Sequence, residues 1–185
     1  MTTQLQAAKA GISTEQIRFV AESESQEVEL VRDELAGGRL VIPANKLHLK
    51  SNLKPAGIGR LLSTKVNANI GTSTVRSSVE AEIKKMQVAL AAGADTIMDL
   101  STGGNLDRIR EELLAQCPVP FGTVPIYQVI EDRSVEEIDG KIILKIIERQ
   151  AKQGVDFFTI HAGVLKEYLP LLRHRVAGIV SRGGA

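Results

Sequence analysis

The sequence predicts an α/β fold, namely a partial (β/α)8 TIM-type barrel of about five parallel strands that follows a short helical N-terminal segment. From residue 64 onward, short apolar runs typical of strands alternate with segments of helical periodicity. These runs recur at regular intervals, and each is followed by polar residues and, in most cases, by glycine. Barrel enzymes build their sites from such strand ends, although a doubly wound parallel sheet remains an alternative.

Strands and helices alternate through residues 64–185, which we predict to be the first five β/α units of a truncated barrel. The predicted strands are Lys65–Ile70, Thr96–Leu100, Gly122–Tyr127, Phe157–His161 and Gly178–Val180. The predicted amphipathic helices span residues 78–92, 105–116, 141–153 and 164–174. A capping box of Ser77 and Glu80 begins the first of these helices. A complete barrel takes about 250 residues, so we expect three further strands beyond Ala185.

Residues 1–63 are predicted to be a helical lead-in and a loop. Two short helices are expected there, the first capped by Ser13 and the second by Ser25. Residues 44–63 contain Pro55, Gly57 and Gly59 and are predicted to form a long loop. The domain boundary is therefore placed between residues 63 and 64.

Composition excludes several classes of protein. The formal net charge is +1 and aromatic residues make up 3% of the chain, with no Trp. Such a chain lacks both the basic surface and the stacking platforms of a nucleic-acid-binding protein. It has no apolar run of the ~20 residues that a membrane span needs, and no apolar signal sequence follows Met1. We expect a cytoplasmic protein with no nucleic-acid or membrane partner.

Metal-binding patterns are missing from the sequence. Its one cysteine, Cys117, precedes Pro118 on the entry side of the third predicted strand, where we expect an inert thiol. No two histidines have metal-ligand spacing, so no metal site is predicted in this segment. The role of His48, in the predicted loop, is left open.

The polar groups at the C-terminal ends of the five predicted strands indicate a small-molecule site. The candidate residues there include Asn69, Met98, Tyr127 and His161. Asn67 and Asn69 lie two residues apart and hence on the same side of a strand, where they either form a structural network or recognise a heterocycle. His161 is either a ligand-facing acid or base or a core histidine. Met98 and Tyr127 allow a packing role or a ligand contact.

The last strand end, Ser181-Arg182-Gly183-Gly184, combines a guanidinium with glycine-rich backbone. These groups either hold an anion or form an ordinary turn with a surface arginine. The segment Ser101–Gly104 lies at the start of a predicted helix, where it likewise either binds an anion or forms an ordinary turn.

Five long motifs in order along the chain resemble the ThiC family of phosphomethylpyrimidine synthases. They are Asn67–Gly71, Gly93–Gly103, Gly122–Gln128, Gly154–Gly163 and Gly178–Gly184. The segment from Phe19 to Pro43 is similar to the family's lead-in, so the resemblance covers nearly the whole chain.

The resemblance implies a radical enzyme that uses S-adenosylmethionine and a [4Fe-4S] cluster. Members rearrange aminoimidazole ribotide, a small-molecule substrate, into the phosphorylated hydroxymethylpyrimidine of thiamine, and they also bind zinc and form homodimers. The family's substrate-binding residues match Asn69, Met98, Tyr127, His161, Ser181, Arg182 and Gly183. Its zinc histidines and its cysteine motif for the cluster have no match in this sequence, so we expect the segment alone to be inactive.

Two departures from the family pattern keep a paralogue in consideration. Leu47 replaces an Asn in the common Asn-x-Asn-His pattern, and Thr72 stands where many members have Asn. The paralogue, 5-hydroxybenzimidazole synthase, converts the same ribotide into a precursor of the cobalamin lower ligand. Two other hypotheses are an inactive fragment that binds ribotide or serves in assembly, and an unrelated Schiff-base aldolase. Lys65 is the only lysine in the predicted strands, and it opens its strand, which disfavours the aldolase.

Overall fold

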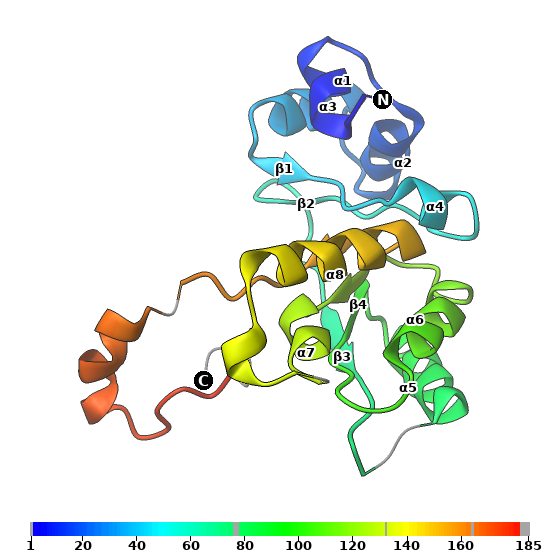
Figure 1. Cartoon of the computed structure of the whole chain (residues 1–185). Coiled ribbons are helices and arrows are strands. Elements are labelled where there is room, and N and C mark those ends of the chain that lie inside the picture. The colour runs from blue at the N-terminus through cyan, green and yellow to red at the C-terminus, as the bar shows by residue number, and fades with distance from the viewer. Residues whose placement is uncertain (1, 76–77, 132, 164, 182–185) are drawn as a thin grey trace.

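Four strands form a parallel sheet in the described part of the chain (Figure 1). The structure is a computed structural model, and it describes residues 2–75, 78–131, 133–163 and 165–181. They are β3 (Asn67–Ile70), β4 (Thr96–Asp99), β5 (Phe121–Thr123) and β6 (Phe157–Phe158). Their spatial order follows their order in the chain, as successive right-handed βα units produce. The predicted α/β class is therefore confirmed. This strand order is consistent with part of a barrel, and closure of the barrel stays a prediction.

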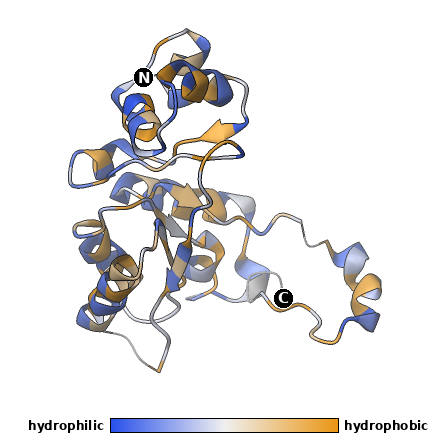
Figure 2. Ribbon diagram, turned by 180° about the vertical axis from the view of Figure 1, so that it is seen from behind, coloured by the Kyte–Doolittle hydropathy of each residue, from blue (hydrophilic) through white to orange (hydrophobic). Residues whose placement is uncertain are grey.

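The helices between these strands agree closely with those predicted. They are α5 (Val79–Ala91), α6 (Leu106–Leu114) and α8 (Gly140–Gln153). Each begins after a side-chain cap, which is supplied by Ser78, Asn105 and Asp139 in turn. The expected cap Ser77 lies outside the described residues. All three helices show both hydrophilic and hydrophobic residues in Figure 2, as amphipathic helices do.

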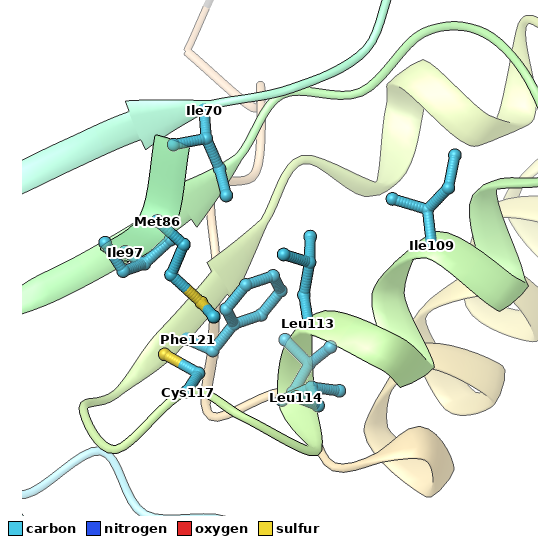
Figure 3. Packing of buried hydrophobic residues seen from close by; sticks show 9 residues of the cluster. Ile70, Met86, Ile97, Ile109, Leu113, Leu114, Cys117 and Phe121 are labelled. Carbon is cyan, nitrogen blue, oxygen red and sulfur yellow. The ribbon is translucent and has the colours of Figure 1, made fainter. Parts of the chain in front are cut away.

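The main core lies between one face of this sheet and helices α5 and α6 (Figure 3). Ile97 and Phe121 reach it from the strands, while Met86 and Leu113 reach it from the helices. Each is at most 1% exposed. Burying a side chain of this size stabilises a fold by ~1.5–3 kcal/mol, so the helices hold the sheet mainly through this contact.

Three helices, rather than the two predicted, precede Leu40 in the described residues: α1 (Gln4–Lys9), α2 (Glu15–Ser23) and α3 (Val28–Ala36). Sequence reasoning missed α1, a helix of six residues in which only two alanines are buried. The cap of α2 is Thr14, one residue after the predicted one. The prediction that Ser25 caps α3 is wrong. Ser25 adopts a left-handed backbone with φ 54°, in the turn before α3.

These helices enclose a second cluster of buried residues, which includes Ile17, Val20, Val31 and Leu35. The predicted loop 44–63 also contains regular structure. β1 (Leu40–Val41) pairs antiparallel with β2 (Ile58–Gly59), and α4 (Lys46–Leu49) lies between them in the chain. Separate clusters for the two parts agree with the proposed division at residues 63 and 64, which stays a prediction.

Two predicted strands end earlier than expected. The third was expected to extend to Tyr127, but β5 ends at Thr123 and Pro125 begins the short helix α7 (Pro125–Val129). Proline favours the first turn of a helix, because its fixed φ suits the helix and its missing N–H needs no partner there. β6 ends at Phe158, and a short 3-10 helix, η1 (Val135–Glu137), lies between α7 and α8.

The fifth predicted strand, Gly178–Val180, is wrong, because these residues have no strand pairing in the described chain. The predicted helix 164–174 is instead a 3-10 helix, η2 (Lys166–His174), which contains Pro170 and buries no described residue. Figure 1 shows this segment extending away from the sheet. Among the described residues, η2 packs no apolar face on the sheet, and so it does not hold residues 178–180 against β6. Across the described ranges, no helix has the length and apolar character that crossing a membrane requires.

Candidate functional site

Strand register places Asn69 directly opposite Met98. Side chains alternate along each strand, so both lie on the face opposite Ile70 and Ile97, which enter the helix-covered core. The helices α5 and α6 therefore leave this face of the sheet open to a ligand. Asn69 is exposed and Met98 is half-buried.

The two asparagines of β3 lie on the same side of the strand, as predicted. The Asn67 amide donates a hydrogen bond of 2.9 Å to Asn69 Oδ1, and the Thr96 hydroxyl donates one of 2.8 Å to Asn67 Oδ1. Asn67 thus belongs to a structural network, and this network orients the side chain of Asn69 above the open face.

The segment after β6 lies against the same face. The Thr159 hydroxyl lies 3.4 Å from Met98 Sδ, which connects this segment to β4. Sequence reasoning did not select Thr159, yet its spacing of two residues before His161 was a signal that both share one side of an extended segment. A hollow of about 590 Å³ adjoins Met98, lined also by Thr96, Phe157 and the segment around Lys65.

Tyr127 and His161 lie side by side, although they come from α7 and from the segment after β6. Their ring centroids are 6.2 Å apart, and the planes are tilted by 34°. His161 Nε2 lies 2.6 Å from the hydroxyl oxygen of Ser181. His161 Nδ1 is buried and has no hydrogen-bond partner among the described residues. A ring nitrogen in that position is available to a ligand.

Five of the seven predicted site residues can therefore be placed in the structure. Asn69 and Met98 are neighbours, as are Tyr127 and His161, with Ser181 at the imidazole. Thr159 connects the two groups along the chain. Arg182 and Gly183 lie outside the described residues.

The segment Ser101–Gly104 is engaged within the protein. The backbone N–H and the hydroxyl of Ser101 both donate to Asp99 Oδ1, at 2.9 and 2.5 Å. The N–H of Thr102 donates to the carbonyl of Thr72. The hydroxyl of Thr72 donates to the Gly103 carbonyl at 2.6 Å. Burial raises the pKa of Asp99, and its bonds to Ser101 oppose that rise. These contacts join the loops after β3 and β4 and leave fewer N–H groups for an anion.

His48 lies outside this candidate site. It is 2% exposed, and its Nδ1 and Nε2 lie 2.6 Å from Asp156 Oδ2 and 2.7 Å from the Cys117 carbonyl. Burial alone would lower the pKa of His48, but hydrogen bonding to Asp156, the charge of that carboxylate and the Cys117 carbonyl together raise it. Two acceptors facing the two ring nitrogens favour a charged imidazolium.

The expectation of an unreactive Cys117 agrees with its environment. The side chain is fully buried, and burial raises the pKa of its thiol to about 12. Within the described ranges, no three His, Cys, Asp or Glu side chains are grouped as a metal site would need.

Two comparisons relate the chain to known proteins. The model of the Radical SAM ThiC family matches residues 3–185. A phosphomethylpyrimidine synthase from Natronomonas pharaonis is 52% identical over 188 aligned positions, which cover 100% of this chain and 39% of that relative. The chain thus spans well under half the length of the curated relative it matches, and it belongs to the radical SAM ThiC family.

Proposed function

We propose that the whole protein is a radical S-adenosylmethionine lyase of thiamine biosynthesis. It would rearrange 5-aminoimidazole ribotide to 4-amino-5-hydroxymethyl-2-methylpyrimidine phosphate. One observation supports the proposal: Asn69 and Met98 are register neighbours on the open face of the sheet, and the rings of Tyr127 and His161, from the two following βα units, lie 6.2 Å apart. The name of the relative, phosphomethylpyrimidine synthase, supports the same chemistry.

These side chains suit recognition of an amino-substituted imidazole carrying a sugar phosphate. The amide of Asn69 offers a donor and an acceptor to a heterocycle edge, and Met98 offers a polarizable apolar surface to its ring. Tyr127 and His161 offer a phenol and an imidazole nitrogen for hydrogen bonds. Ser181 and, by family resemblance, Arg182 and Gly183 would bind the phosphate.

The radical cofactor is not held by the residues of this chain. A cysteine-ligated cluster needs several thiolates, whereas Cys117 is the one cysteine in the sequence, is buried and has a pKa of about 12. We therefore assign to this chain the binding and orientation of the ribotide. The cluster, the S-adenosylmethionine site, zinc and a homodimeric assembly are proposed for the whole protein on family grounds alone.

Calorimetry with aminoimidazole ribotide on the whole protein tests the binding role. Tyr127→Ala and His161→Ala should each weaken binding, whereas His174→Ala, at an exposed histidine of η2, should leave it unchanged. Equal affinity in all three variants would refute the proposed site.

Mass spectrometry of the product then identifies the reaction. A phosphorylated pyrimidine supports the proposal, and 5-hydroxybenzimidazole would assign the protein to the paralogous branch. Ribotide binding without turnover in the reconstituted protein would instead indicate a binding or assembly role.

A further inference from the structure

The helix that carries Tyr127 is too short to fix its own position. α7 has five residues and begins without a side-chain cap. A single turn is unstable in isolation, because forming the first turn orders several residues for one hydrogen bond. The orientation of α7 must therefore come from its surroundings, among which are α8, packed beside it in Figure 1, and the buried residue Val129.

Gln128, the next residue along α7, makes three hydrogen bonds in the layer between the helices. Its Oε1 accepts from Arg110 Nη2 and from Gln150 Nε2, each at 2.8 Å. Its Nε2 donates to Asp107 Oδ1 at 3.0 Å. Asp107 and Arg110 belong to α6 and Gln150 to α8, so a single side chain joins α7 to both neighbouring helices.

The donors and acceptors of this network allow one orientation of the Gln128 amide. Arg110 can only donate, and the ionised Asp107 carboxylate can only accept. The Thr123 hydroxyl donates to Gln150 Oε1 at 2.6 Å, which turns the Gln150 NH2 group toward Gln128. Arg110 and Gln150 are 2% and 1% exposed, so reversing the amide would leave buried groups unpaired at a high free-energy cost.

We propose that Gln128 is a positioning residue, which fixes the rotation of α7 and so holds the Tyr127 ring beside His161. Consecutive residues of a helix project about 100° apart, so one side chain can enter the network while its neighbour faces the site. Any rotation that moved Tyr127 away from His161 would also withdraw Gln128 from its three partners. A role in ribotide binding rests on the proposed function, whereas the structural part of the inference does not.

Nuclear magnetic resonance on this chain tests the structural part. We expect the nuclear Overhauser effect between the Tyr127 and His161 rings to fall several-fold in Gln128→Met, which keeps the side-chain length and removes all three hydrogen bonds. The matched control is Gln153→Met, because Gln153 also bonds to Arg110 from α8 but makes no described contact with α7. An effect of wild-type strength in folded Gln128→Met would overturn the inference.

A second variant keeps the test decisive if Gln128→Met does not fold. Asp107→Ala removes the acceptor of the Gln128 NH2 group, together with the ion pairs of Asp107 to Arg110 and Arg149, at a side chain that is 34% exposed. The same ring–ring signal should weaken in this variant. Its full retention would overturn the inference on its own.

A double-mutant cycle on the whole protein tests the role in binding. If Gln128 acts through Tyr127, Gln128→Met should raise the ribotide Kd about tenfold, equivalent to ~1.4 kcal/mol, in the wild-type background. In a Tyr127→Ala background it should have little effect, and additive losses would overturn the inference. An unchanged Kd in Tyr127→Ala alone would refute the proposed site. It would not affect the structural part of the inference, because the ring–ring signal does not depend on ribotide binding.

Discussion

Replacing His48 by alanine should destabilise the protein strongly, because it would leave the Asp156 carboxylate buried without its cation. The two side chains are 1% and 0% exposed, and their atoms are 2.6 Å apart. The carboxylate also accepts hydrogen bonds from the N–H groups of Asn45 and Phe121, at 2.6 and 2.7 Å. It therefore connects the segment before α4 to the start of β5, and neither can move without breaking a contact with Asp156.

Removing one partner of a buried ion pair costs ~3–5 kcal/mol, and we expect the free energy of unfolding to fall by about this amount in His48→Ala. For a protein of this size, 1 kcal/mol lowers Tm by roughly 2–4 °C, so the loss corresponds to about 6–20 °C. Urea and thermal denaturation followed by far-ultraviolet circular dichroism would measure it. Lys50→Ala, at an exposed residue just after α4, is the matched control and should stay within ~0.5 kcal/mol of wild type. A His48→Ala protein as stable as this control would refute the reasoning.

The pH dependence of stability in a second variant, His48→Gln, checks the charge on His48. The pKa of His48 is raised in the folded protein, so the folded state binds the proton more tightly than the unfolded state. Its contribution is fully present below the unfolded pKa of ~6.5 and is lost as pH rises through the folded pKa. The stability gap between wild type and His48→Gln should therefore shrink as pH increases above neutrality. A gap that stayed constant over this range would show that the imidazole is already neutral in the fold.

Three further predictions concern the core and the loops around the sheet. Gly103→Ala should lose ~1–3 kcal/mol in urea denaturation, because a Cβ there would lie 2.5 Å from the backbone of the loop after β3, whereas Gly163→Ala meets open space and should be neutral. Cys117 should resist iodoacetamide at pH 8 while the protein is folded and react once urea unfolds it; rapid labelling of folded protein would contradict its pKa of about 12. Glu82→Ala should cost ~1–3 kcal/mol, since it removes the buried carboxylate that accepts the Gly71 N–H at 2.8 Å, and an unchanged urea midpoint would contradict this.

Sequence patterns predicted the elements that depend on local signals and burial. The helices α5, α6 and α8 combine a side-chain cap with an apolar stripe, and both signals are local. The strand at Gly178–Val180 failed for a different reason, because a short apolar run pairs only where a neighbouring strand and a packed helix hold it. Its preceding helix has the right spacing of leucines, yet they remain largely exposed. Periodicity shows that a face is apolar, but it does not show what covers that face.

The hydrogen-bond network around Asp156 could not be predicted from the sequence for a related reason. Asn45 and His48 lie more than one hundred positions before Asp156, with separations of 111 and 108 residues. No local pattern indicates such a contact, so His48 could not be assigned from the sequence. The structure also gives a reason why Leu47 is tolerated between them. The Leu47 side chain is 42% exposed, whereas the imidazole of His48 and the backbone N–H of Asn45 bind the carboxylate.

Polar residues at the strand ends fall into two sets that the sequence motifs did not separate. Alternate residues of each strand, such as Asn69 and Met98, face the open side of the sheet. The residues between them, such as Asp99 and Thr123, face the helices and are buried. Asp99 is hydrogen-bonded to Ser101, and Thr123 to Gln150. Because neighbours in a strand point to opposite faces, one polar motif can supply both a ligand contact and its support. The candidate site therefore depends on polar contacts on both faces of the sheet, and a substitution on the helix side can alter binding without touching the ligand.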